Sequence, residues 1–115
     1  MKTMQGRAQI EIRKAGDNEY YFLFRLPKDG IFISIFFEDI VEAVAAAENI
    51  KRSATEESCY LRKNDNTGLS YFIFNIRKIF PIGQSSIYKY GPSMDSGINF
   101  MKKYLAEAEI VDLTT

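Results

Sequence analysis

The sequence predicts an α+β fold in which one largely antiparallel sheet carries two helices on one face. The first observation behind this prediction is an internal repeat. Ile12-Arg13-Lys14 followed by Tyr21 to Leu26 recurs as Leu61-Arg62-Lys63 followed by Tyr71 to Ile76. The second is that each copy runs through strand-like alternation before it changes to helical periodicity. Strands grouped ahead of a helix are typical of a two-layer α+β architecture.

We expect residues 1–115 to form a single domain made of two repeats, at about 9–57 and 58–114. The composition, with 46% hydrophobic and 26% charged residues, is that of a globular chain and excludes a disordered or fibrous one. A lone unit of about fifty residues buries too little surface to be stable by itself. The two repeats should therefore share one core.

The first copy begins with three strand patterns. Residues 9–13 alternate in polarity, residues 20–26 place Phe22 and Phe24 on one face, and residues 31–37 are apolar on both faces apart from Ser34. Pro27-Lys28-Asp29-Gly30 has the composition of a tight turn between the second and third strands. A strand that is apolar on both faces lies either in the centre of a sheet or under a partner.

Residues 38–52 of the first copy then change to helical periodicity. Asp39 is placed to accept the free N–H groups of the first turn, with Glu42 three residues later as in a capping box. Lys51 and Arg52 suit the carboxyl end of the helix dipole. The apolar stripe of this helix comprises Ile40, Ala43, Val44, Ala47 and Ile50.

The second copy repeats this order. Strands are expected at 58–62, 71–77 and 82–89, and a closing strand at 109–113. Between them, Gly91-Pro92-Ser93 opens a helix, because proline is tolerated at the first helical position. The apolar stripe of this second helix comprises Met94, Ile98, Met101 and Leu105.

Charge and cysteine content narrow the class of protein. Fifteen basic and fifteen acidic residues give a formal net charge of zero, which removes the long-range field of a dedicated nucleic-acid or anionic-membrane binder. No stretch approaches the roughly 20 apolar residues needed to span a bilayer, and the polar amino terminus lacks a secretion signal. The single cysteine excludes an internal disulfide. We therefore expect a cytoplasmic protein without a membrane partner.

We expect neither an enzyme nor a cofactor. The chain has no histidine, the commonest general base and metal ligand. Cys59 alternates with Leu61 on the apolar side of its strand, so an inert core thiol is predicted. The carboxylates around Asp39 are explained by helix capping. The turn at 64–68 faintly resembles a calcium loop but lacks the later bidentate glutamate, which leaves a hairpin turn as its interpretation.

The sheet face opposite Phe22 and Phe72 is the candidate binding surface. Such a face is a solvated surface, a protein interface, or a stacking platform for single-stranded nucleic acid. Acidic Glu11 and the zero net charge count against nucleic acid, which stays the alternative to a non-enzymatic binding module with a protein partner. Besides Leu23 and Ile73, the residues expected on this face are Arg13, Tyr21, Arg25, Tyr60, Arg62, Tyr71 and Arg77.

Four features together resemble one known family. They are the tandem Phe-rich strands, Ser85-Ser86-Ile87-Tyr88, Gly97-Ile98 leading to Met101-Lys102, and the closing stretch Ala108 to Thr114. Over roughly residues 9 to 114 the chain resembles the YegP-like bacterial domain, a family of unknown function. The resemblance implies paired β3-α-β units that build one sheet and exchange their closing strands. A tandem member should therefore be a monomer that resembles a fused dimer.

The chain also departs from this family. Its members tend to have tryptophan in the second strand and Asn-Gly in the turn that follows, whereas this chain has no tryptophan and offers Asp29-Gly30. The first copy carries Phe37 and Ala46-Ala47 where the second carries Tyr88 and Gly97-Ile98. The two copies are thus not equivalent, and we expect any binding surface to be single and off the pseudo-twofold axis.

Overall fold

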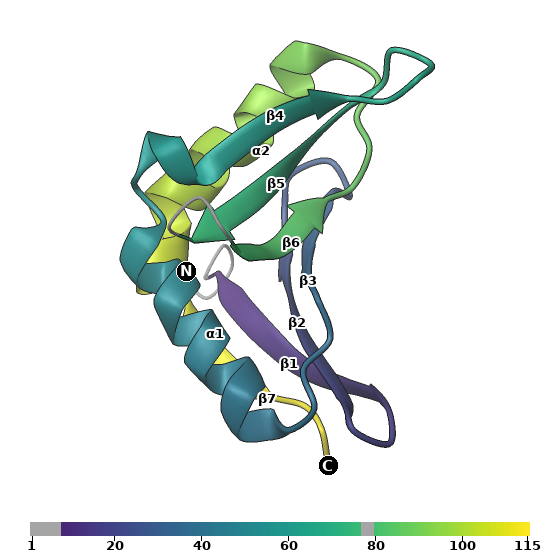
Figure 1. The fold of residues 1–115 in the computed structure, drawn as a ribbon. Helices are drawn as coiled ribbons and strands as arrows, with labels where there is room; N and C mark the ends of the chain where they lie inside the picture. Colours follow the sequence, from purple (N-terminus) through teal and green to yellow (C-terminus); the bar gives the residue numbers. More distant parts are fainter. Residues whose placement is uncertain (1–7, 77–79) are drawn as a thin grey trace.

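One sheet and two helices make up the fold in the computed structural model, which describes residues 8–76 and 80–115. The strands of this 7-stranded sheet follow the order β4-β5-β6-β3-β2-β1-β7. Both helices lie on the same side of it (Figure 1). The α+β class and the single, largely antiparallel sheet are therefore as predicted. The elements are β1 (Gln9–Gly16), β2 (Glu19–Arg25), β3 (Ile31–Ser34), α1 (Ile40–Ser53), η1 (Glu57–Cys59), β4 (Tyr60–Asn64), β5 (Ser70–Ile76), β6 (Phe80–Ser85), α2 (Gly91–Tyr104), η2 (Leu105–Glu107) and β7 (Glu109–Asp112).

The strand after α2 crosses to the first half of the sheet. β7 pairs with β1 in parallel, with Ile110 opposite Ile10, whereas the neighbouring pairs of the sheet are antiparallel. This is one of the two closing-strand exchanges that the resemblance implied, and the second is not found among the described residues. After α1 the chain passes through η1 directly into β4, which pairs with β5. The short connection at 54–59 leaves no length for a separate closing strand there.

Phenylalanine side chains from both halves form the centre of the core. Phe22, Phe24, Phe72 and Phe74 are at most 1% exposed. Phe32 stacks on Phe72 with ring centroids 6.0 Å apart and meets Phe74 edge-on at 6.3 Å. Burying each such ring contributes roughly 1.5–3 kcal/mol. The predicted core face of the second strands is confirmed, and the helices cover it with Ala43, Ala47, Ile50, Ile98, Met101 and Leu105.

β3 and β6 form the seam between the halves. Phe32 lies opposite Ser85 and Ser34 lies opposite Gly83. A Cβ atom on Gly83 would stand 2.3 Å from the Ile33 carbonyl oxygen, so only glycine allows this close approach. The apolar strand predicted at 31–37 is thus central in the sheet. It ends earlier than predicted, at Ser34, and the chain then continues to a single bridge between Phe37 and Tyr20.

A buried serine hydroxyl terminates each central strand. Ser34 Oγ accepts a hydrogen bond from the Phe22 N–H at 2.8 Å and donates to the Ile35 carbonyl at 2.7 Å. Ser85 Oγ accepts from the Phe72 N–H at 3.0 Å and donates to the Ser86 carbonyl at 2.8 Å. Each hydroxyl replaces a missing strand partner for a buried N–H group, which explains polar residues inside the core.

The turn between β2 and β3 has the left-handed backbone that hairpins prefer. Lys28 and Asp29 have φ values of 60° and 66°. The Leu26 N–H donates to the Gly30 carbonyl at 2.8 Å and closes the turn. Asn-Gly is the favoured sequence for such a turn. Here Lys28 and Asp29 take these positions, and their positive φ angles strain the backbone.

Replacing Ser85 by alanine should destabilise the fold, because the buried Phe72 N–H would lose its acceptor. We expect the free energy of unfolding to fall by about 1–3 kcal/mol. Urea denaturation followed by circular dichroism measures this change. Ser58→Ala, at an exposed position, is the matched control and should stay within about 0.5 kcal/mol of the parent. Equal urea midpoints for the two variants would contradict the role of the hydroxyl.

Candidate functional site

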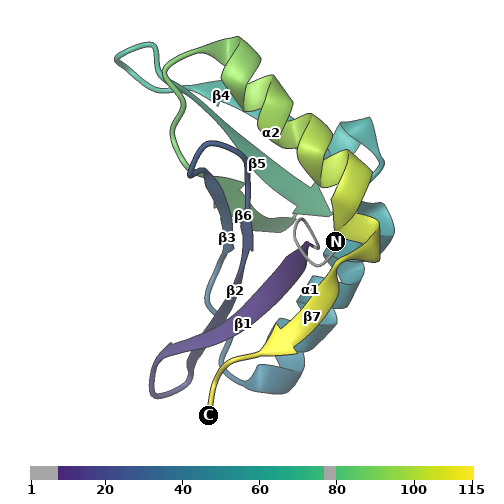
Figure 2. The same cartoon turned by 180° about the vertical axis from the view of Figure 1, so that it is seen from behind.

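The candidate site is the sheet face that the helices leave uncovered, here called the outer face. Both helices lie on the opposite side in either view of the molecule (Figures 1 and 2). Arg13, Tyr21, Arg25 and Tyr71 lie on the outer face as predicted, because each pairs out of phase with the buried phenylalanines. Strand register defines the face by Glu11, Arg13, Tyr21, Leu23, Arg25, Ile33, Lys63, Tyr71, Ile73 and Gln84.

Glu11 holds the two arginines of this face. Arg13 Nη2 lies 2.7 Å from Glu11 Oε1, and Arg25 Nε lies 2.9 Å from Glu11 Oε2. Burial acts to raise the pKa of Glu11, but the hydrogen bonds from Arg25 and Arg13 outweigh it and keep this pKa below its usual range. Two cations and one carboxylate leave one net positive charge. The arginines are therefore paired groups rather than two free cations.

An apolar area lies beside this charged cluster. Tyr21 meets Phe36 edge-on, with ring centroids 5.8 Å apart. Phe36 is 59% exposed and Ile35 is 46% exposed. Sequence reasoning missed both residues, because it placed them in a strand covered on both faces. The signal was Ser34, whose hydroxyl ends the strand and turns the next residues outward.

Tyr60 and Arg62 do not lie on the outer face, which corrects the prediction. Tyr60 pairs with Phe74 and Arg62 with Phe72, so both point toward the helix layer. The error came from matching Ile12-Arg13-Lys14 with Leu61-Arg62-Lys63. The pairing of the strands instead equates Ile10 with Tyr60, one residue out of step. A shift of one residue moves every side chain of a strand to the other face.

Tyr60 is a core residue. It is 3% exposed, and its ring meets Phe74 edge-on at 5.0 Å. Its hydroxyl donates a 2.6 Å hydrogen bond to the Ala54 carbonyl at the end of α1. Burial raises the pKa of this hydroxyl. Tyr60 therefore joins β4 to α1 and offers no ring to a ligand on the outer face.

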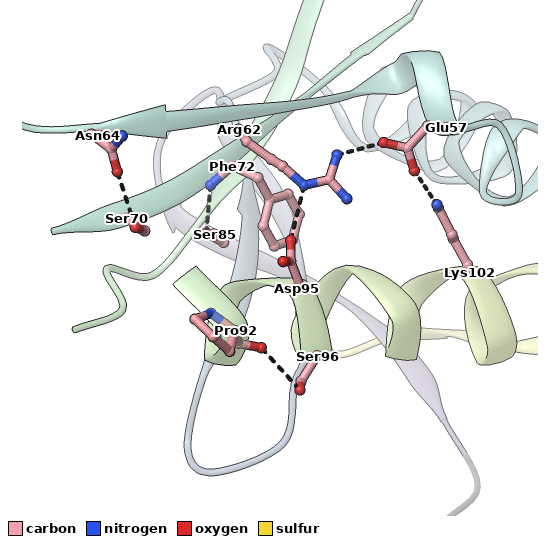
Figure 3. A network of polar contacts seen from close by, with 10 residues as sticks. All are labelled: Glu57, Arg62, Asn64, Ser70, Phe72, Ser85, Pro92, Asp95, Ser96 and Lys102. Carbon is pink, nitrogen blue, oxygen red and sulfur yellow. Dashed lines mark hydrogen bonds and ion pairs between the residues drawn. The ribbon is translucent and has the colours of Figure 1, made fainter. Parts of the chain in front are cut away.

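Arg62 belongs to a polar network between β4 and α2 (Figure 3). Its Nε atom lies 2.9 Å from Asp95 Oδ1, and its Nη1 atom donates to Glu57. Lys102 of α2 donates to the other oxygen of Glu57. These hydrogen bonds from Arg62 and Lys102 lower the pKa of Glu57 to about 2. The network holds the edge strand β4 against α2.

The remaining predicted residues fall into three groups. Cys59 is buried as predicted, and burial raises the pKa of its thiol. Asp39 caps α1 by accepting the Glu42 N–H at 2.9 Å, and Asp65 accepts the N–H groups of Thr67 and Leu69 in a hairpin turn. Arg77 lies outside the described residues.

Within residues 8–76 and 80–115, no three side chains of the kinds His, Cys, Asp and Glu gather closely enough to hold a metal ion. Neither described helix has the length and apolar character needed to cross a membrane.

Tyr88 occupies a tight space between two glycines. A Cβ atom on Gly97 would stand 2.6 Å from the Tyr88 hydroxyl, and one on Gly30 would stand 2.9 Å from it. The hydroxyl is buried and has no hydrogen-bond partner of acceptable geometry in the described part of the chain. Burial raises the pKa of this hydroxyl, and the nearby Ser86 offsets only part of the rise. The space filled by the hydroxyl is therefore available because residue 97 has no side chain.

The comparisons with known proteins point to one group. A UPF0339 protein from the ptx operon 5′ region of Stutzerimonas stutzeri is 29% identical over 96% of this chain and 98% of its own. Another UPF0339 protein, from Pseudomonas aeruginosa, is 21% identical over 91% of this chain and 96% of its own. No protein-family model matches the chain.

Two structures solved by NMR share the fold. The yegP protein of E. coli, described as a protein of unknown function, superposes with a TM-score of 0.84 at 21% identity, covering 94% of each chain. A UPF0339 protein of Shewanella oneidensis superposes with a TM-score of 0.85 at 19% identity, covering 93% of this chain and 92% of that one. Both likenesses support the sheet order and the helix placement described above.

Replacing Glu57 by glutamine should weaken the network in a pH-dependent way. The pKa of Glu57 falls from 4.5 to about 2 on folding, so its contribution is complete above pH 4.5 and is lost as the pH falls toward 2. The side chain is 58% exposed, so we expect a loss of no more than about 1 kcal/mol near neutral pH. Urea denaturation at several pH values should show the two proteins converging in acid. A constant difference, or an equal effect of Glu48→Gln, would contradict this.

Gly97→Ala should be destabilising only while Tyr88 keeps its hydroxyl. In the parent we expect a loss of about 1–3 kcal/mol from the steric conflict. In a Tyr88→Phe background we expect a gain of about 0.5–1 kcal/mol, because alanine is the better helix residue. A double-mutant cycle in urea measures the coupling. Additive effects would show that the hydroxyl does not require the glycine.

Proposed function

We propose that this chain, which belongs to the YegP-like family, also named UPF0339, is a binding module that captures a protein partner with its outer face. The exposure of Phe36 against the Tyr21 ring, with exposed Ile35 next to it in the chain, is the observation that carries this proposal. Exposed apolar patches with a polar rim mark contact surfaces. The module needs no chemistry of its own, only a partner that covers this patch.

The charges next to the patch indicate what the partner carries. Glu11, Arg13 and Arg25 leave one positive charge in excess, and the Arg25 side chain is 63% exposed. A carboxylate of the partner would offset this excess charge at Arg25, whose side chain is the more exposed of the two arginines. We therefore propose a partner whose contact surface is apolar and bears an acidic side chain opposite Arg25.

Charge favours such a partner over two other occupants. A second copy of the chain, stacked face to face, would bring a second positive cluster against the first. Single-stranded nucleic acid would need a row of positive charges and open ring faces, and this cluster carries only one positive charge in excess. Both arginines are already bound to Glu11, and Phe36 packs against Tyr21. Neither occupant is favoured by these contacts.

We infer further that the halves are copies of one unit that have diverged on this face. Support comes from the equal lengths of α1 and α2, 14 residues each, and from the equivalent hydrogen bonds of Ser34 and Ser85. The outer arginine of β2, Arg25, corresponds to Asn75 in β5, which cannot pair with a carboxylate in the same way. Among the described residues, the cluster of Glu11, Arg13 and Arg25 therefore has no equivalent in the second half, and it lies away from the seam.

A photo-crosslinking residue at position 36 tests the proposal in cells. Benzoylphenylalanine there should form an adduct with a protein. At position 41, an equally apolar site that is 73% exposed on α1, it should form none. Arg25→Glu should lower the yield at position 36 by about fivefold, the factor expected for loss of one surface ion pair. The yield of the adduct is measured on denaturing gels, and its components are identified by mass spectrometry.

Three results would overturn the proposal. They are equal yields at positions 36 and 41, an adduct with twice the mass of the chain, and an adduct that nuclease removes. Tyr21→Glu, which puts a charge into the patch, is a second variant. It should abolish the adduct while the circular dichroism spectrum stays unchanged. An unchanged yield would show that the patch is not the contact surface.

A further inference from the structure

A cavity lies away from the outer face, where the β2–β3 turn approaches the start of α2. Its volume is about 180 Å³. Pro27 and Lys28 line it from the turn, and the stretch from Ile87 to Tyr90 lines it from the segment after β6. Ser96 and Gly97 line it from the first turns of α2. Residues of both halves of the chain thus meet in one hollow.

The charge of the lining has one sign. Lys28 and Lys89 both border the cavity, and the described residues that line it include no Asp or Glu. The corresponding end of the first half differs, because Glu38 stands where Lys89 stands in the second half. There, Asp39 and Glu42 satisfy the start of α1. An anion at the α2 end would therefore lie beside two lysines, with no carboxylate among the described lining residues.

The body of the lining is apolar. Pro27, Ile87 and the rings of Tyr88 and Tyr90 supply most of it. A cavity of roughly 150 Å³ is large enough to hold one benzene ring in a protein interior. At about 180 Å³, this cavity has space for a single ring with one small substituent.

One wall of the cavity is held in place before a ligand arrives. The Tyr88 ring forms a wall whose position is set by its hydroxyl between Gly30 and Gly97. The start of α2 adds few donors, because Pro92 has no N–H and the Ser93 N–H is bonded to the Tyr90 carbonyl at 3.1 Å. Anion binding must therefore come from the lysines rather than from the helix terminus.

From this lining we propose that the cavity binds a small carboxylate with a flat apolar body, of about the size of benzoate. The ring would lie against Tyr88 and Pro27, and the carboxylate would be directed toward Lys28 and Lys89. The site is separate from the outer face, so its occupant and the proposed protein partner can be tested independently.

Titration of the full chain with benzoate, followed by amide chemical shifts in NMR, tests the proposal. We expect saturable shifts at Lys28, Lys89 and Gly97. Benzyl alcohol, which keeps the ring without the charge, should bind about tenfold more weakly, and so should inorganic phosphate, which keeps the charge without the ring. Absence of saturable shifts would overturn the site. Equal binding of benzyl alcohol or of phosphate would overturn the ligand class.

Two pairs of variants make the test specific. The double variant Lys28→Gln/Lys89→Gln should weaken benzoate binding by about tenfold. The control, Lys63→Gln/Lys103→Gln, removes the same charge elsewhere and should leave benzoate binding unchanged. Ser96→Leu should fill the cavity and abolish the shifts, whereas Asn99→Leu on an exposed position of the same helix should leave them unchanged. Equal effects within either pair would overturn the proposal. Tyr21→Glu should leave benzoate binding intact, which separates this site from the outer face.

Discussion

The pairing of β3 with β6 is the contact on which the rest of the structure depends. It places Phe72 and Phe74 of the second half against the Phe32 ring of the first half. On the other strand of the seam, Gly83 allows the backbone of β6 to approach that of β3 closely, because a Cβ atom there would stand 2.3 Å from the Ile33 carbonyl oxygen. The sheet is therefore continuous across the seam, both helices share one core, and the outer face is one surface instead of two.

Sequence reasoning predicted the parts of the fold that periodicity determines. Alternation of Phe22 and Phe24 identified the buried face, and the stripe of α2 identified its contact with the sheet. Sequence reasoning did not predict the register of β4. At an edge strand a long side chain such as Arg62 can cover apolar surface with its stem while its guanidinium group reaches other charges. Polarity alone therefore does not show which way such a residue points, and the similar letters of the repeat favoured the wrong choice.

The candidate site was predicted in part for the same physical reason. Alternation places Arg13 and Arg25 on one face with Glu11, but it does not show that one carboxylate holds both guanidinium groups across two strands. Divergence between the halves was visible in the sequence at Tyr88 and Gly97. Only the structure shows that these two changes compensate, since the hydroxyl of one fills the space left by the other.

The parallel pairing of β7 with β1 has a consequence for how the molecule is made. On the β7 side, Ile10 has no strand partner until Ile110 has been synthesised. The two residues are separated by nearly the whole chain. Until then the edge of β1 presents free backbone groups to other chains. Contacts this distant in sequence slow folding. The nascent first half is therefore the stage at which a cell has most reason to protect this protein from aggregation.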